Sequence, residues 1–247
     1  LLILPCFNEE ENVKSLIHRI DKALHRFVNY EIIAVNDGSE DHTGELLKEL
    51  SNEYPILILE HNTNKGLSDA LHTGLEKALQ NSSDDDFIIT MDSDNTHDPQ
   101  HIIHMLSITR HGADIVIGSR YIPEGKQINV SPHRIPLSKT INVLIGKIAK
   151  IPVKDATSGY RCFKASTLRK LKKTLGQKFL ESKGFEASFE LLVKTFWCCS
   201  NIQEVPITLD YSKKKGKSKM RILPTIKRYC VTLAKIKSWR KRMEVND

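Results

Sequence analysis

The sequence has few features of extracellular or membrane-spanning proteins. Its 247 residues include 5 Cys, an odd number, and none of them forms a C-x-x-C pair. This pattern is not typical of a disulfide framework or a zinc site and favours free thiols in a reducing compartment. No signal peptide is recognisable, and no run approaches the ~20 apolar residues of a spanning helix. We therefore expect any membrane association to be peripheral or to depend on a membrane-anchoring subunit.

The sequence is also poor in aromatic residues, which make up 6% of it, and its charge is unevenly distributed. The net charge is +7, but residues 210–247 alone hold 13 Lys and Arg against 3 Asp and Glu, so the remainder is slightly acidic. A basic segment of this kind predicts an anionic partner. Nucleic acid is not favoured, because no nucleic-acid module accompanies the charge.

Short apolar runs alternate with helix-like segments through the first half of the chain. We expect strands at residues 1–5, 31–35, 56–59, 87–91 and 114–117, and helices at 9–25, 43–50, 66–79 and 99–109. The first run opens without an initiator Met, so a few residues are expected to precede it. The alternation predicts an α/β fold with a mostly parallel, Rossmann-like sheet flanked by helices, whose ligands bind beyond the carboxyl ends of the strands.

The second half is less regular. Residues 122–136 contain three prolines and are expected to form a loop, followed by helices at 138–150 and 184–196 and an edge strand at 204–209. We divide the chain into a domain at 1–221 and a tail at 222–247. Apolar residues at steps of three or four predict that the tail is a basic amphipathic helix.

Two carboxylates, Asp92 and Asp94, directly follow the apolar run 87–91. Carboxylates at this spacing can bind one hard divalent cation, Mg²⁺ or Mn²⁺, which prefers oxygen ligands and accepts phosphate oxygens as well. The cation would neutralise charge on a leaving diphosphate. A solvated turn is the alternative, since Asp and Ser favour turns.

Other polar segments are open to two interpretations. Asp37 follows the run 31–35 and could bind a base or ribose, although by itself a D-G turn is the simpler explanation. Glu9 could be only an acidic residue near a helix N-terminus. The five lysines of 213–219 could form an anion-binding loop or a solvated one. The histidines, including His97, form no clear ligand set and are expected to be exposed or satisfied.

Together these segments resemble glycosyltransferase family 2, whose GT-A fold binds nucleotide sugars. The resemblance rests on P-C-F-N-E (5–9), V-N-D-G-S (35–39), N-K-G-L (64–67) and D-S-D (92–94). Further elements are G-S-R-Y (118–121), H-R (133–134), D-A-T-S-G-Y-R-C-F (155–163), E-V-P-I (204–207) and G-K-S-K (216–219). Their order is similar to that of polyprenyl-phosphate glycosyltransferases of the dolichyl-phosphate mannose synthase type.

The resemblance implies roles for the matching residues. The donor would be bound by Pro5, Phe7, Glu9, Asp37, Lys65, Asp92, Ser93, Asp94, Lys213 and Lys219. The acceptor phosphate would be bound by Arg120, Arg134, Ser138, Asp155 and Arg161. The catalytic residues would be Asp92, Asp94, Arg120 and Arg134, with Asp92 and Asp94 as metal ligands. Three positions depart from the family pattern: Thr96 replaces a Gln that can assist the metal, Lys213 replaces an Arg, and His133 replaces a Trp.

The implied reaction is inverting transfer of a sugar, with mannose favoured, from a nucleotide sugar to a polyprenyl phosphate. GDP-mannose is the favoured donor, and a UDP-sugar is possible. An ionised phosphate needs no general base, but it needs cations beside it to approach an anionic donor. One alternative is a family 2 enzyme acting on a glycan hydroxyl, which requires a base. Another is a non-catalytic nucleotide-binding module at a membrane surface.

The proposed acceptor influences how the tail is interpreted. Its apolar stripe could pack on the domain, or it could lie among lipid headgroups with Lys and Arg near anionic lipids. Because polyprenyl phosphate resides in a membrane, we favour the lipid placement. We therefore expect a cytoplasmic protein, peripherally associated with the cytoplasmic face of a membrane.

Overall fold

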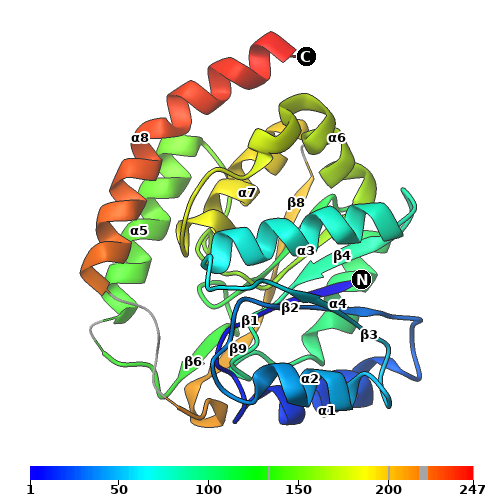
Figure 1. Ribbon diagram of the computed structural model, residues 1–247. Helices are drawn as coiled ribbons and strands as arrows, with labels where there is room; N and C mark the ends of the chain where they lie inside the picture. The colour runs from blue at the N-terminus through cyan, green and yellow to red at the C-terminus, as the bar shows by residue number, and fades with distance from the viewer. Residues whose placement is uncertain (133, 200, 217–221, 247) are drawn as a thin grey trace.

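The computed structural model describes residues 1–132, 134–199, 201–216 and 222–246 (Figure 1). The strands are β1 (Leu2–Cys6), β2 (Ile32–Asn36), β3 (Ile56–Glu60), β4 (Phe87–Thr90), β5 (Ile115–Ser119), β6 (Lys126–Ile128), β7 (Arg161–Lys164), β8 (Ile202–Pro206) and β9 (Thr208–Asp210). The α-helices are α1 (Val13–Leu24), α2 (Thr43–Leu50), α3 (Leu67–Asn81), α4 (His101–Arg110), α5 (Arg134–Ala149), α6 (Ala165–Leu175), α7 (Glu186–Cys198) and α8 (Ile222–Asn246). Short 3₁₀ turns lie at η1 (Gly176–Phe179) and η2 (Tyr211–Lys213).

The main sheet has the strand order β3-β2-β1-β4-β7-β5-β8. Neighbouring strands pair in parallel except at β7, which is antiparallel to both β4 and β5. The mostly parallel sheet is the one that the alternation predicts, and β8 lies at its edge, as expected for a strand that contains Pro206. A smaller sheet pairs β6 with β9 in parallel.

Helices cover both faces of the main sheet because successive strand residues point to opposite faces. Leu2 and Leu4 pack with apolar residues of α1, α2 and α4, whereas Ile3 packs with those of α3, α6 and α7. The carboxyl ends of β1, β2 and β4 therefore meet at one edge between two helical layers. This places the segments after Cys6, Asn36 and Thr90 side by side.

The second half differs from the expectation in several places. Helix α6 and strand β6 have no counterpart among the expected elements, and the strand expected at 204–209 is divided into β8 and β9, which belong to different sheets. Two further differences concern α5 and β7. Helix α5 begins at Arg134, inside the segment expected to be a loop. The last proline of that segment, Pro136, therefore lies in the first turn of the helix, where proline is tolerated. Strand β7 follows directly on a stretch of turn-like composition, and its buried residues occupy the interior of the sheet. Neither feature has a periodic pattern long enough to be recognised from sequence alone.

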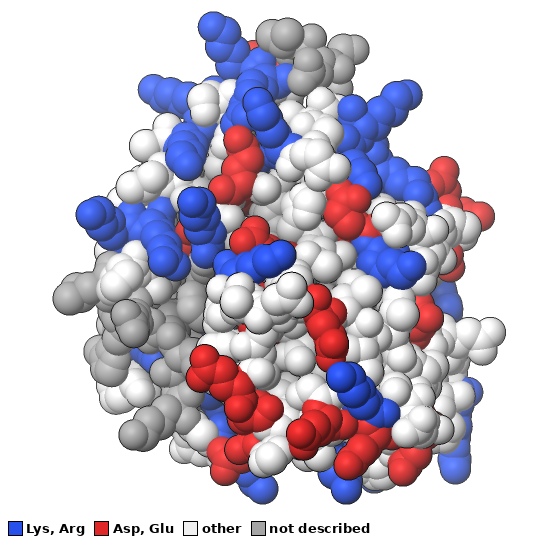
Figure 2. Space-filling view, viewed as in Figure 1, with Lys and Arg blue, Asp and Glu red and all other residues white. Residues whose placement is uncertain are grey.

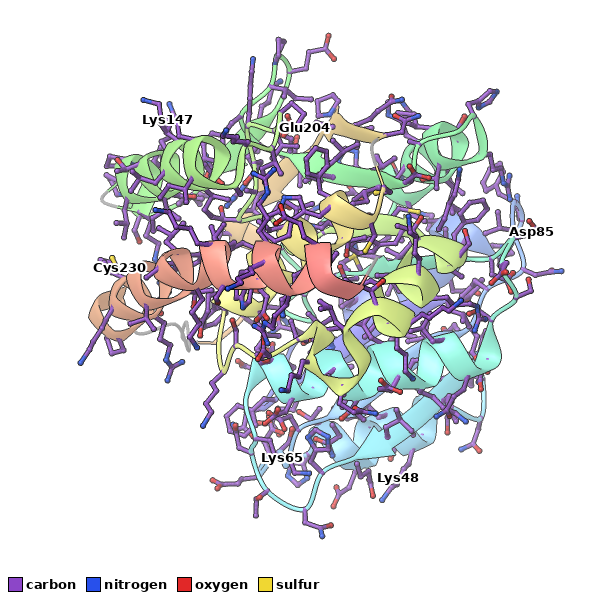
Figure 3. All side chains as sticks on the ribbon, turned by 90° about the horizontal axis from the view of Figure 1, so that it is seen from above. Lys48, Lys65, Asp85, Lys147, Glu204 and Cys230 are labelled. Atoms are coloured by element: carbon purple, nitrogen blue, oxygen red, sulfur yellow. The ribbon has the colours of Figure 1, made fainter. Side chains whose placement is uncertain are left out.

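The tail helix α8 packs on the rest of the molecule beside α5, and also contacts α6 and α7 (Figures 1 and 3). Tyr229, Ile236, Trp239 and Met243 on α8 are buried in the same core as Ile3. The placement of the apolar stripe among lipid headgroups is therefore wrong, because the stripe contributes to the core. The boundary at residues 221/222 stays a prediction. No described helix is both long and apolar enough to cross a membrane.

Candidate active site

A cavity of about 450 Å³ opens beyond the carboxyl ends of β1, β2 and β4 and extends to α5 and α8. We call the part after these strands the strand-end rim; it includes Pro5, Phe7, Glu9, Asp37, Asp92, Ser93 and Asp94. We call the opposite part the helical rim; it includes Arg134, Leu137, Ser138, Ile141, Lys183, Phe185, Arg228 and Tyr229. Residues predicted for donor and acceptor thus line one cavity.

Asp37 organises the loop that follows β3. Its carboxylate accepts hydrogen bonds from the backbone N–H groups of Lys65 (3.0 Å) and Gly66 (2.8 Å), and it lies 2.6 Å from His61 Nδ1. The turn at Gly38 requires glycine, because φ is +65° and a Cβ would lie 2.4 Å from the Thr63 carbonyl carbon. Lys65 therefore contributes its backbone here, while its side chain is exposed.

Asp92 and Asp94 follow β4 and both line the cavity. The Asp92 side chain is 46% exposed, yet desolvation in the cavity and the negative charge of Asp94 raise its pKa to about 6. Asp94 accepts hydrogen bonds from the backbone (3.2 Å) and hydroxyl (2.6 Å) of Thr96 and from Lys214 Nζ (2.7 Å). Burial alone would raise the pKa of Asp94, but Lys214 and Thr96 lower it below the ordinary value.

The loop after Asp94 is tightly held. Ser93 Oγ donates to the Pro5 carbonyl (2.6 Å), which joins the loop to β1, and Asn95 adopts a left-handed φ of 64°. His97 is 4% exposed, with Nδ1 4.0 Å from Asp92 Oδ2 and its ring 4.9 Å from the Tyr160 ring. Burial lowers the pKa of His97 to about 4, so its imidazole is neutral near pH 7.

The basic loop contributes a different lysine from the one expected. Lys214 lines the cavity beside Asp94, and burial disfavours its charge, but Asp94 more than offsets this and raises the pKa of Lys214. Lys213 instead points to Asp98, at 3.9 Å, and is not part of the cavity lining. The loop is tethered by Asn12, which bonds the backbone N–H (2.9 Å) and carbonyl (3.0 Å) of Lys215.

Lys219 and His133 lie outside the described residues, so the structure does not address their expected roles. The other expected acceptor-side residues divide into lining and supporting groups. Arg134 and Ser138 line the cavity from α5, and the Arg134 guanidinium lies 6.0 Å from the centre of the Tyr211 ring.

Arg120 lines the cavity but is bound to a buried carboxylate. Its Nε and Nη2 donate to Asp155 Oδ2 (2.7 Å) and Oδ1 (2.6 Å), and Nη2 also donates to Thr157 Oγ1 (2.9 Å). Burial opposes both charges, but each partner offsets this for the other, which raises the pKa of Arg120 and lowers that of Asp155. Arg120 thus contributes a fixed positive charge.

Asp155 and Arg161 support the site without lining the cavity. Asp155 is fully buried beneath Arg120, and its backbone N–H donates to Glu204 (2.9 Å). Arg161 is 1% exposed and donates to the carbonyls of Ser188 and Ala156. Burial lowers the pKa of Arg161 to about 10. Their positions fit residues that orient the lining groups around them.

Several lining residues of the helical rim have no signal in the sequence. Lys183, Phe185, Arg228 and Tyr229 come from the loop before α7 and from α8, and they meet only because α8 packs against α7. The Arg228 guanidinium packs on Gly184, where a Cβ would lie 2.4 Å from Nη1. Lys214 could have been suspected from the lysine run, but the run does not say which lysine faces the cavity.

The two carboxylates fit a divalent cation whose other coordination positions are filled by water and phosphate oxygens. Asp92 and Asp94 face one cavity, and their mutual repulsion is relieved when a cation binds between them. Among the described residues, no group of three or more His, Cys, Asp or Glu side chains could bind a metal alone. Two carboxylates with the remaining positions left to water and phosphate is the usual arrangement for Mg²⁺.

Comparison with known proteins identifies the family of the chain. The model of glycosyl transferase family 2 matches residues 1–172. A dolichol-phosphate mannosyltransferase from Pyrococcus furiosus is 36% identical over 223 residues, which are 89% of this chain and 58% of that protein. A polyprenol monophosphomannose synthase from Mycolicibacterium smegmatis is 32% identical over 222 residues, 89% of this chain and 80% of that protein. The chain thus spans less than two thirds of the Pyrococcus protein.

The fold is also that of a solved GT-A structure. Glucosyl-3-phosphoglycerate synthase from Mycobacterium tuberculosis, in complex with Mn²⁺, UDP-glucose and phosphoglyceric acid, superposes with a TM-score of 0.65 at 16% identity. The match covers 100% of this chain and 80% of that one. The GT-A fold predicted from the sequence is confirmed, and the chain belongs to glycosyltransferase family 2.

Proposed function

We propose that this glycosyltransferase transfers mannose from GDP-mannose to a polyprenyl phosphate, with inversion, at a membrane surface. The observation that carries the proposal is the composition of the cavity described above. Asp92, Asp94 and Lys214 line the cavity near the strand ends, Arg134, Lys183 and Arg228 line the helical rim, and Arg120 adds a further cation. An acceptor that is itself an anion explains the excess of cations on the side away from the carboxylates.

The residues support a simple division of labour. Asp92 and Asp94 would bind Mg²⁺ or Mn²⁺, which supplies charge neutralisation for the donor diphosphate. Lys214 is close enough to Asp94 to contact the same diphosphate. An acceptor phosphate oxygen would form the new bond to the anomeric carbon while the bond to the nucleotide diphosphate breaks. Because Arg120 is already fixed by Asp155, its charge needs no reorganisation during the reaction.

The helical rim also supports an acceptor with an apolar chain. Leu137 and Ile141 of α5 line the cavity, and on the outside of the same helix Val143, Leu144 and Ile148 are 54%, 43% and 45% exposed. On α8, Val231 is 50% exposed. Exposed lysines interleave with these residues: Lys139, Lys147, Lys150, Lys227 and Lys235. A surface of this kind suits the headgroup layer of an anionic membrane.

The figures show where this surface lies. Lys147 on α5 and Cys230 on α8 lie at the outer side of the molecule, opposite Lys48 and Lys65 (Figure 3). Figure 2 shows Lys and Arg gathered toward the end that carries α6 and α8, with Asp and Glu toward α1 and α2. We infer that the protein associates peripherally with the cytoplasmic face of a membrane through the outer sides of α5 and α8, rather than through the buried stripe of α8.

A product assay tests the proposal. The protein is incubated with Mg²⁺ or Mn²⁺, a panel of GDP- and UDP-sugars, and a short-chain polyprenyl phosphate, and lipid-linked sugar is detected by mass. Mannosyl-phosphoryl-polyprenol from GDP-mannose is the expected product. Glycan hydroxyl acceptors are tested in parallel, and product from these alone would contradict the proposed acceptor. Donor binding without product from any acceptor would favour a non-catalytic module.

Binding to vesicles tests the membrane surface separately. The paired change Leu144→Ser and Ile148→Ser removes exposed apolar area, so co-sedimentation with anionic vesicles is expected to weaken by about 10-fold or more. The control is Phe27→Ser, which alters a side chain that is 67% exposed in the segment after α1, away from the sequence of both α5 and α8. Equal binding of the control and the paired variant would contradict the assignment.

A further inference from the structure

Two polar groups beside the proposed metal site face each other without a hydrogen bond. His97 Nδ1 is buried and has no hydrogen-bond partner among the described residues. The nearest carboxylate oxygen is Asp92 Oδ2, at 4.0 Å, and no described residue donates a hydrogen bond to the Asp92 carboxylate. A buried nitrogen without a partner costs about 1–3 kcal/mol, so an arrangement that joins the two groups is favoured.

The two groups differ in freedom of movement. The His97 ring is 4% exposed and packs against Tyr160, whose hydroxyl donates to the Asp98 carbonyl (3.0 Å). The residues just before His97 are also held, because the backbone N–H and the hydroxyl of Thr96 donate hydrogen bonds to Asp94. The Asp92 side chain is 46% exposed in the cavity, so it can rotate, and a movement of about 1 Å would bring Oδ2 within hydrogen-bond distance of Nδ1.

We propose that His97 is a positioning residue that donates a hydrogen bond from Nδ1 to Asp92 and so orients this carboxylate toward the divalent cation. The inference rests on the proposed function only in that Asp92 is a metal ligand. Carboxylates that bind metals are commonly held by a second hydrogen-bonding group, and removal of that group lowers metal affinity about 10- to 100-fold. In this chain, the other carboxylate already has such partners in Thr96 and Lys214, which leaves Asp92 as the one that needs His97.

Three substitutions at one position test the proposal. His97→Asn places an amide nitrogen near the position of Nδ1, His97→Gln places one near Nε2, and His97→Phe removes both nitrogens. Mn²⁺ dissociation constants are measured by electron paramagnetic resonance of free Mn²⁺, without donor or acceptor. We expect about 10- to 100-fold weaker binding for the Gln and Phe variants and a change of less than about 3-fold for the Asn variant.

The controls separate this inference from the proposed function. His104→Gln changes an exposed histidine of α4 and is expected to leave Mn²⁺ affinity unchanged. Thermal unfolding of each variant identifies misfolding, and the Asn variant keeps the proposal testable if the Phe variant does not fold. Full affinity in the Gln variant, or equal losses in the Asn and Phe variants, overturns the role of His97 alone. A protein with native His97 that binds no Mn²⁺ overturns the metal assignment and this inference with it.

A spectroscopic measurement distinguishes positioning from direct ligation. Electron spin echo spectra of the Mn²⁺ complex report nitrogen atoms that are bound to the metal. We expect no directly bound histidine nitrogen, because His97 reaches the metal only through Asp92. A nitrogen coupling that disappears in His97→Phe would make His97 a ligand and would overturn the positioning role.

Discussion

The two rims of the cavity are built in different ways. On the strand-end rim, backbone N–H groups of short loops hold two carboxylates: those of Lys65 and Gly66, after β3, bind Asp37, and that of Thr96 binds Asp94. On the helical rim, positions depend on side chains from distant elements, such as Arg228 packed on Gly184 and Glu181 bonded to Arg242. The first rim is therefore suited to fixed ligands such as a cation and a diphosphate. The second depends on the docking of α8 and is suited to a partner that enters from a membrane.

Removal of a carboxylate from the strand-end rim is expected to have the largest effect. Asp94→Ala removes a proposed metal ligand and should abolish measurable turnover, a loss of at least about 10²-fold. The fold should remain, because Asp94 is at a surface of the cavity rather than in the core. Product formation and thermal unfolding are measured together. The control is Asp98→Ala in the same loop, which removes the ion pairs with Arg19 and Lys213 and a hydrogen bond from Gln100 N–H, but no carboxylate that lines the cavity. Turnover of Asp94→Ala at the level of this control would contradict the metal assignment.

Two arginines of the cavity, Arg134 on the helical rim and Arg120 above Asp155, separate acceptor binding from structural support. Arg134→Ala should lower kcat/KM for the acceptor phosphate by about 10²-fold, the loss expected for charge-assisted hydrogen bonds, with little change in donor affinity. Arg120→Ala should also lower the melting temperature, because Asp155 is fully buried and would lose its partner. Isothermal titration with the nucleotide, acceptor kinetics and thermal unfolding are the measurements. Equal losses for donor and acceptor in Arg134→Ala would count against a role specific to the acceptor.

Adjacent lysines provide a smaller and more local test. Lys214→Met should weaken binding of GDP with Mn²⁺ by about 10-fold, because it removes the cation beside Asp94. Lys213→Met removes the lysine that the sequence favoured, but its ammonium lies by Asp98 and the expected change is less than about 2-fold. Titration calorimetry measures both. The reverse order of effects would restore the role predicted for Lys213.

The same contrast explains what the sequence could predict. Asp37, Asp92 and Asp94 are visible in the sequence as carboxylates that follow apolar runs, but a turn is the alternative explanation for each, and the family resemblance is what favours a site. Their grouping in one cavity follows from topology alone. The Arg120–Asp155 pair joins residues on either side of α5, and only the family resemblance identified its members.

The helical rim could not be predicted because it depends on how helices dock. The apolar stripe of α8 is compatible with a core or with a lipid surface, and the choice is made by contacts with α5, α6 and α7. Lys183 and Arg228 become neighbours of the cavity only after this docking. Likewise, the lysine run at 213–219 does not indicate which lysine faces the cavity, because the loop is held in place by hydrogen bonds between Asn12 and Lys215.

A buried ionic cluster links the helical rim to α8, and it leads to the smallest expected effect. Lys194 is fully buried; it bonds Glu190, lies 3.1 Å from Glu181 and stacks on the Trp239 ring at 4.7 Å. Arg242 of α8 donates to Glu181 at 2.7 Å. Glu190 in turn accepts hydrogen bonds from the backbone of Glu181 and Ser182, next to the lining residue Lys183. The cluster thus joins α7, the loop before it and the end of α8.

The pH dependence of stability tests this link. Burial alone would raise the pKa of Glu181, but Arg242 and Lys194 lower it from 4.5 to about 2. The contribution of Glu181 is therefore fully present above about pH 4.5 and is lost as the pH falls toward 2. Glu181→Gln should cost about 1 kcal/mol or less of unfolding free energy at pH 6, since solvent screens the pair with Arg242, and the difference from the native protein should shrink as the pH falls to 3.

Urea unfolding followed by Trp239 fluorescence in a Trp197→Phe background measures this free energy with a probe near the end of α8. The matched control, Glu60→Gln, affects only an exposed pair with Lys48. A Glu181→Gln effect that stays constant between pH 6 and 3 would mean that the Glu181 charge does not fasten α8, and the helical rim would then depend on apolar packing alone.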